Sequence, residues 1–306
     1  MLRDRLAPFF VILAASLWAV DGIVLRPILY NLPVTLVVFV ESVIVALLLT
    51  PIMAKHFGKL KDLTHRDWLA FLGVALFGGA IGTMAITKAL FYVNYVNLSI
   101  VILIQKLQPV FALVLAGILL KEKLTKKFFF WAGFAIIGAY FMTFGLHLPE
   151  LKAGDKTALA AIFALIAAIS FSSSTVLSKR ALRNVGFELG TYLRFTLTTI
   201  IMLIIVLTSG TITEISEISS HQLFIFLLIA FTTGGTAIFL YYYGLKRISA
   251  SVATICELAF PLTAVMLEYF LRGNIMGPVQ WAGAFLLFFS IVRVTNLSSI
   301  MTKAKD

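Results

Sequence analysis

The sequence of 306 residues has little of what soluble enzymes and metalloproteins are built from. It contains a single cysteine, Cys256, which excludes an intramolecular disulfide and a cysteine-based metal site. Charged residues make up only 13% of the chain, about half the share in ordinary soluble domains. Because a soluble domain of this size needs a largely polar surface, the composition argues against a soluble globule. The 60% share of hydrophobic residues excludes a disordered chain.

Motifs for nucleotide, metal and nucleophilic chemistry are also missing. There is no G-x-x-x-x-G-K-[ST] loop for a nucleotide phosphate and no H-E-x-x-H pair for zinc. The sequence has four histidines, all in loops or near the ends of apolar runs: His56, His65, His147 and His221. The apolar runs therefore lack the histidines that a metal site or a Ser–His pair within them would need. We expect no metal, no cofactor and no catalytic residue.

What the sequence does contain is a series of apolar runs of about twenty residues, which is the length that crosses a bilayer as a helix. The runs are continuously apolar rather than alternating, so helices are favoured over a β-barrel. We expect ten spans, at 7–25, 33–54, 68–87, 97–119, 128–147, 157–177, 188–208, 222–243, 249–271 and 279–296. The first run has no small-residue cleavage pattern and is interpreted as a retained span.

The net charge of +11 is distributed in short loops between the apolar runs. This distribution argues against a nucleic-acid partner and for contact with the lipid bilayer. Most of the 25 lysines and arginines fall on one side of the membrane if there are ten spans. The positive-inside rule then predicts a multi-pass protein of the cytoplasmic membrane with both termini in the cytoplasm.

The two halves of the chain repeat each other. Trp131–Gly133 recurs as Trp281–Gly283, and Pro109 is matched by Pro261, at a spacing of about half the chain. Each half holds five spans, and an odd number means that the second half enters the membrane from the opposite side. The predicted fold is all-α, with ten transmembrane helices in two inverted five-helix repeats.

We divide the chain into a first repeat at 1–150, with spans one to five, and a second at 151–306, with spans six to ten. Four segments carry a resemblance to a known family: Ile104–Phe111, Leu119–Leu124, Tyr243–Ser251 and Cys256–Leu262. They resemble the drug/metabolite transporter superfamily, in its branch with ten spans and two EamA-type repeats. The resemblance covers nearly the whole chain and implies transport of small organic solutes, such as amino acids or related metabolites, often by export.

A charge in the middle of a bilayer costs about 2.5–3.5 kcal/mol on insertion scales, so such residues indicate function. Glu257 lies in the ninth span, four residues before Pro261. Because proline leaves the carbonyl at i−4 without its helical donor, we expect a free Glu257 carbonyl beside its carboxylate. Gln105 holds the equivalent place before Pro109. We predict a substrate-binding or proton-coupling site there; the alternative is a structural kink with a paired carboxylate.

Other polar residues are predicted to share this site. Lys106 pairs with Glu257 or Asp21, or meets an anionic part of a substrate, and Gln108 widens the polar stripe. Asp21 follows Trp18 by three residues, so the two share a helix face. A ring beside a carboxylate suits a cationic or zwitterionic ligand. The alternative for Lys106 is a buried ion pair, and for Asp21 an interfacial position.

Two further features have mainly structural interpretations. Glu41 and Arg194 occupy equivalent positions in the two repeats, and we expect a structural salt bridge or separate partners rather than a substrate contact. The family often has a basic residue at the first of these positions. Tyr241, Tyr242 and Tyr243 end the eighth span and are expected to lie in the interfacial aromatic belt, unless one ring acts as an inner gate.

The predicted function is a secondary active transporter that works by alternating access, with Glu257 and Asp21 as carboxylates that can couple transport to protons. Two alternatives stay open at this point: an intramembrane enzyme that acts on lipid head groups, and a passive solute channel. No motif indicates an oligomeric state.

Overall fold

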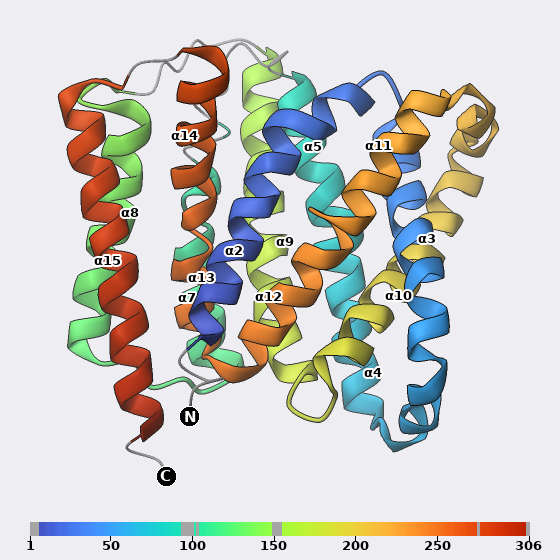
Figure 1. Ribbon diagram of the computed structural model, residues 1–306, viewed down its shortest axis with the longest axis horizontal. Helices are drawn as coiled ribbons and strands as arrows, with labels where there is room; N and C mark the ends of the chain where they lie inside the picture. Colours follow the sequence, from blue (N-terminus) through green and yellow to red (C-terminus); the bar gives the residue numbers. More distant parts are fainter. Residues whose placement is uncertain (1–5, 93–100, 102–103, 149–154, 274–275, 304–306) are drawn as a thin grey trace.

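The computed structural model describes residues 6–92, 101, 104–148, 155–273 and 276–303. Every regular element in these ranges is a helix. The helices stand side by side, and the start of α2 (Ala7–Val20) lies at the same end of the bundle as the end of α15 (Pro278–Lys303) (Figure 1). The predicted all-α fold is confirmed, and the position of these two ends fits an even number of crossings.

The helices follow the predicted spans. Those of the first half are α2, α3 (Val34–Met53), α4 (His65–Val74), α5 (Gly82–Tyr92), α7 (Gln108–Leu119) and α8 (Lys126–Phe144). Those of the second half are α9 (Asp155–Ala181), α10 (Phe187–Thr208), α11 (Ser220–Phe231), α12 (Gly235–Arg247), α13 (Ala250–Cys256), α14 (Ala259–Arg272) and α15. Short π-helical and 3-10 segments join or extend them: η1 (Asp21–Leu25), η2 (Arg26–Leu29), η3 (Ala54–Asp62), η4 (Ala75–Ile81) and η5 (Thr211–Glu217).

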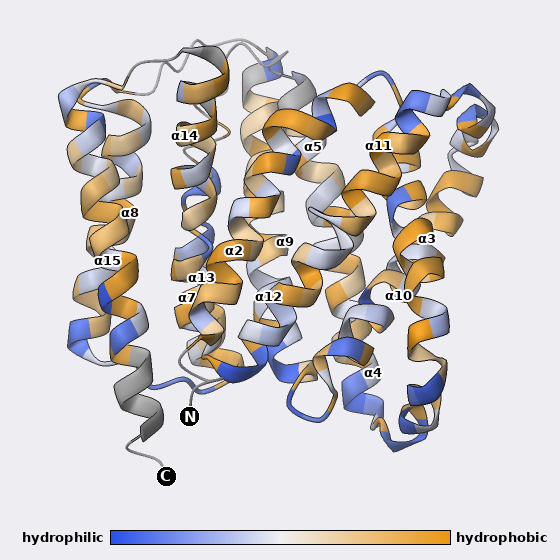
Figure 2. Ribbon diagram, viewed as in Figure 1, coloured by the Kyte–Doolittle hydropathy of each residue, from blue (hydrophilic) through white to orange (hydrophobic). Residues whose placement is uncertain are grey.

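Within the described ranges, 9 helical stretches are long and apolar enough to cross a membrane. The shorter apolar helix α7 belongs to the predicted fourth span, 97–119, part of which lies outside the described residues. The prediction of ten spans is therefore consistent with the structure. Hydrophobic residues run along the helices, and hydrophilic residues gather toward the two ends of the bundle (Figure 2).

The third span of each half begins with the same local device. At the start of α4, Asp67 N–H donates to Thr64 Oγ1 and Thr64 N–H donates to Asp67 Oδ2 (3.3 and 3.0 Å). At the start of α11, Ser219 and Gln222 make the same pair of bonds (3.2 and 3.0 Å). Such a capping box satisfies two backbone donors that a helix start leaves unpaired. The shared cap is a trace of the repeat that the spacing of the larger motifs predicts.

Helix packing follows the symmetry expected of two inverted repeats. The first span of each half packs on the third span of the other, as α2 on α12 and α9 on α4 and α5. The second spans pack on each other, as α3 on α10, and so do the fifth spans, α8 on α15. The boundary between the repeats at residue 150 stays a prediction, because residues 149–154 lie outside the described part.

Helices α8 and α15 approach each other closely at two glycines. A Cβ on Gly138 would lie 2.7 Å from the Leu287 nitrogen, and a Cβ on Gly283 would clash with the Met142 nitrogen. Since these neighbours are backbone atoms, a side chain fits only if the helices separate. Overpacking of this kind costs about 1–3 kcal/mol.

We therefore expect Gly138→Ala to lower the melting temperature of the detergent-solubilised protein. The control is Gly133→Ala in the same helix, where an added Cβ has nothing within 4 Å. That variant gains helix propensity, about 1 kcal/mol, and is expected to melt at the same temperature as the parent or higher. Equal melting temperatures for the two variants would contradict this close crossing.

Candidate functional site

Several spans lose their α-helical regularity partway across the bundle. The first span contains the π-helical turn η1 and the third contains η4. The fourth, eighth and ninth are interrupted at Lys106–Leu107, at 232–234 and at Glu257–Leu258. Such interruptions are tolerated in a membrane where the backbone is buried in protein or lines a cavity. They are frequent at the binding sites of secondary transporters.

Glu257 lies at one of these interruptions and is surrounded by neutral hydrogen-bond donors. Its carboxylate accepts from Tyr241 Oη at 2.6 Å, from Gln108 Nε2 at 2.9 Å and from Thr175 Oγ1 at 3.3 Å. These donors come from the eighth, fourth and sixth spans. The group, which we call the Glu257 cluster (Gln108, Thr175, Tyr241 and Glu257), therefore joins both repeats at one point.

The Trp18 ring packs against Tyr241 of this cluster. The Trp18 ring centroid lies 5.2 Å from that of Tyr241, and the two planes are tilted by 53°. On another side, Ser172 Oγ lies 2.8 Å from the Gln108 carbonyl oxygen. Trp18, Gln108 and Glu257, which are predicted to share a site, thus lie close together around Tyr241. Their role in binding stays a prediction.

The expectation of a free Glu257 carbonyl is wrong. The Phe260 N–H donates to it at 2.9 Å, because the chain tightens into a turn between α13 and α14 instead of continuing as a kinked helix. The same turn occurs in the first repeat, where Leu107 N–H donates to Ile104 O at 2.9 Å, as Leu258 N–H does to Ile255 O at 3.1 Å.

This match places Lys106, rather than Gln105, at the position that corresponds to Glu257. Gln105 instead donates to the Ala164 carbonyl on α9 at 2.8 Å. Lys106 is only 7% exposed. It forms no hydrogen bond or ion pair with any residue in the described part of the chain, so the predicted pair with Glu257 or Asp21 is not found there. Pro109 and Pro261 each lie in the first turn of the helix that follows the interruption, where proline is tolerated.

Asp21 belongs to a second cluster, which contains Arg26, one residue beyond the predicted first span at 7–25. Arg26 Nε donates to Asp21 Oδ2 at 2.6 Å, and its terminal nitrogen donates to Glu41 Oε2 at 3.0 Å. Thr233 Oγ1 donates to the other Asp21 oxygen at 3.2 Å. Asp21 is therefore a buried ion-pair partner rather than an interfacial residue. We call Asp21, Arg26 and Glu41 the carboxylate–arginine triad.

The π-helical turn explains why Arg26 meets Asp21. The backbone N–H of Arg26 donates to the carbonyl of Asp21, five residues earlier in the chain. An α-helix would direct side chains at this spacing apart, because neighbours on one face are three or four residues apart. The Asp21–Arg26 pair therefore cannot be predicted from α-helical periodicity. It depends on the one additional residue that a π-helical turn holds relative to an α-helical turn.

Glu41 and Arg194 form no salt bridge with each other. Of the two structural alternatives predicted for them, separate partners is the one that the structure shows. Arg194 donates to Ser174 Oγ at 3.5 Å and to Tyr242 Oη at 3.4 Å. The two residues nevertheless keep equivalent neighbours. A Cβ added to Gly78 in the third span would lie 3.2 Å from a terminal nitrogen of Arg194. A Cβ added to Gly234 in the eighth span would lie 2.9 Å from Glu41 Oε1.

The predicted aromatic belt is wrong for two of its three tyrosines. Tyr241 and Tyr242 are buried, and their hydroxyls bond inside the bundle, to Glu257 and to Ser178 (2.6 and 2.8 Å). Only Tyr243 is partly exposed, with the Arg247 guanidinium 3.7 Å from its ring centroid. Three consecutive tyrosines point in different directions around a helix, so no run of this kind lies on one face.

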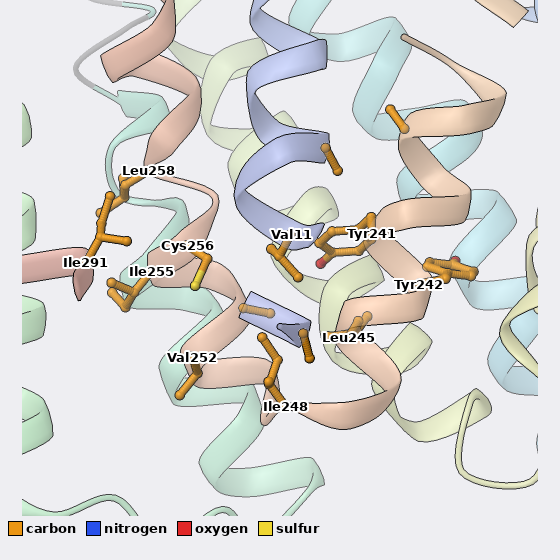
Figure 3. Close-up of a cluster of buried hydrophobic side chains, with 14 of the residues drawn as sticks. Val11, Tyr241, Tyr242, Leu245, Ile248, Val252, Ile255, Cys256, Leu258 and Ile291 are labelled. Atoms are coloured by element: carbon orange, nitrogen blue, oxygen red, sulfur yellow. The ribbon is translucent and has the colours of Figure 1, made fainter. Parts of the chain in front are cut away.

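An apolar cluster that includes Tyr241 extends toward the end of the bundle where α2 begins and α15 ends. It includes Val11, Leu245, Ile248 and Val252, and Figure 3 shows these side chains together with Tyr241. At the same end, Glu122 accepts from the backbone of Ala250 at 2.8 Å and ties the loop after α7 to the start of α13. These contacts pack the helices against one another at this end.

Comparison with known proteins adds the family. The model of the EamA-like transporter family matches residues 5–144 and again residues 158–296. A protein of Fusobacterium nucleatum subsp. nucleatum named riboflavin transporter ImpX is 44% identical over 289 residues, which cover 94% of this chain and 97% of the relative. A Synechocystis protein named uncharacterized transporter sll1164 is 26% identical over 254 residues, covering 81% of this chain and 70% of the relative.

A solved crystal structure is similar over almost its full length. Its TM-score is 0.74 at 16% identity, with 97% of this chain and 98% of that chain covered, and the likeness shows the fold alone. Within the described residues, no group of three or more acidic, histidine or cysteine side chains is arranged to hold a metal ion. The two family matches, one on each half of a helical chain, show that this protein belongs to the EamA-like transporter family and is a multi-pass membrane transporter rather than an enzyme.

Proposed function

We propose that this protein carries riboflavin, or a solute with the same flavin ring system, across the cytoplasmic membrane by alternating access of a site between the two repeats. The observation that carries the proposal is the 44% identity, over nearly the full length of both chains, to a protein named as a riboflavin transporter. The excess of lysine and arginine in the loops on one side supports an orientation with both termini in the cytoplasm.

The chemistry of the Glu257 cluster supports a flavin. Riboflavin is uncharged at neutral pH, and its planar ring presents amide-like donors and acceptors along one edge. Trp18 and Tyr241 supply aromatic faces, while Gln108 and Glu257 supply a donor and an acceptor beside them. Pockets for such ligands are mostly apolar and aromatic, with a few polar groups that fix orientation.

A second candidate is a zwitterionic solute of the amino-acid class, as the superfamily resemblance implies. It is favoured by Lys106 and Glu257, which bring opposite charges to corresponding turns of the two repeats. A zwitterion needs one charge of each sign, whereas riboflavin needs neither. Export, which the resemblance also implies, and proton coupling remain predictions.

The test is flux in proteoliposomes that contain the purified protein. We expect saturable riboflavin uptake, accelerated when unlabelled riboflavin is loaded inside, because a carrier returns faster with a substrate bound. Empty liposomes and excess unlabelled riboflavin serve as controls. Flux that rises linearly with concentration and shows no counterflow would instead indicate a channel. Saturable flux of amino acids with none of riboflavin would support the second candidate and exclude the first.

A further inference from the structure

A groove lies between α8 and α15, away from the Glu257 cluster. Its volume is about 660 Å³, and its lining contains Lys126, Lys127, Phe130, Trp131, Arg293, Asn296 and Leu297. Both helices stand at one edge of the bundle, and the groove lies toward the end where α15 finishes (Figure 1). The transport function leaves this site without a role.

The groove is strongly cationic. Lys126, Lys127 and Arg293 are exposed. None of the three forms an ion pair with a carboxylate in the described part of the chain. Arg293 is instead held by aromatic rings, with its guanidinium carbon 4.6 Å from the Phe289 centroid and 5.7 Å from the Trp131 centroid. Three positive charges thus lie in one groove, and no carboxylate in the described part of the chain pairs with them.

The surroundings of the groove are apolar. Phe130 is 55% exposed and Phe289 is 44% exposed, on helices that face outward from the bundle. In Figure 2, hydrophilic residues gather at the lower end of α8 and α15, below long hydrophobic stretches. A ligand in the groove therefore meets cations at one end and an apolar surface directly above them. This arrangement matches the two parts of a phospholipid.

We propose that the α8–α15 groove binds the headgroup of an anionic phospholipid, whose acyl chains lie along Phe130 and Phe289. Lys126 and Lys127 contact the phosphate as point charges, and Arg293, held by its rings, supplies a planar donor. Basic grooves between transmembrane helices on the cytoplasmic side suit such headgroups. The site needs no particular transported solute, so it stands apart from the flavin proposal.

The test is a thermal-shift titration of the full-length protein in zwitterionic micelles with phosphatidylglycerol or phosphatidylcholine. A ligand that binds only the folded state raises the melting temperature. We expect a rise with phosphatidylglycerol and little with phosphatidylcholine. The double variant Lys126→Gln/Lys127→Gln is expected to weaken the apparent affinity by about fivefold for each charge removed, and Arg293→Gln by a similar factor.

The matched control is Lys59→Gln/Lys61→Gln, which removes two exposed charges in η3 on another loop and is expected to keep the full response. An equal loss in the two double variants would overturn the site, because it would show attraction to overall charge only. A similar shift with inorganic phosphate at the same concentration would overturn the assignment to a lipid. A groove covered by a second copy of the chain, seen as a dimer that phosphatidylglycerol does not affect, would also overturn it.

Discussion

Arg26→Gln is expected to cost about 3–5 kcal/mol of folding free energy, because it leaves the carboxylates of Asp21 and Glu41 buried without their counter-charge. Both pairs are close, at 2.6 and 3.0 Å, and both carboxylates are largely shielded from solvent. Reduced yield in the membrane and a lower melting temperature in detergent measure the effect. Arg183→Gln, at an exposed site, is the matched control and is expected to change neither.

The triad also predicts a rescue. In Asp21→Asn/Arg26→Gln/Glu41→Gln, every charge is removed while the shapes of the side chains are nearly kept. Removing a whole buried ion-pair group is commonly far less costly than removing one partner, so we expect most of the stability to return. A triple variant as unstable as Arg26→Gln would show that the destabilisation comes from lost packing of Arg26 rather than from unpaired carboxylates.

The second large effect is expected for Glu257→Gln, which should lower transport by at least about tenfold, or 1.4 kcal/mol, with little change in melting temperature. The amide has nearly the shape of the carboxylate, so the helices stay in place. However, it lacks the charge that strengthens the bonds from Tyr241, Gln108 and Thr175. Flux and counterflow in proteoliposomes, with the melting temperature of the same preparations, measure both properties.

Glu217→Gln is the control, since it makes the same chemical change at an exposed position after the seventh span. Counterflow separates two roles for Glu257. Loss of both net flux and counterflow indicates a binding residue, whereas loss of net flux driven by a proton gradient, with counterflow kept, indicates a coupling residue. Full flux and full counterflow in Glu257→Gln would remove this carboxylate from the mechanism.

Much of the fold could be predicted from the sequence because one physical requirement dominates it. A backbone in lipid must satisfy its own hydrogen bonds, so apolar runs of sufficient length become helices, and the repeat follows from matched motifs such as Trp131–Gly133 and Trp281–Gly283. Membership of the drug/metabolite transporter superfamily, inferred from diffuse motifs, is confirmed by the two family matches.

The candidate site was predicted only in part, since its contacts depend on irregular turns. Arg26 falls just outside the predicted first span, 7–25, and no α-helical spacing joins it to Asp21; the π-helical turn η1 does so. The position of Tyr241 near the end of a span is typical of aromatic belts and predicts an interfacial ring. Its burial depends on helix packing, which the order of residues along one span does not give.

The two halves of this protein make unlike polar contacts at equivalent positions of their first and second spans. In one half Arg26 pairs with both Asp21 and Glu41. In the other half Arg194, which corresponds to Glu41, donates to Ser174, which corresponds to Asp21, and to Tyr242. In the proposed cycle, a carrier made of two identical copies would have two empty forms of equal free energy, each the image of the other. Because these contacts are unlike, that equality is lost. The empty carrier then has a preferred resting form, which sets the side from which a solute finds it more often available.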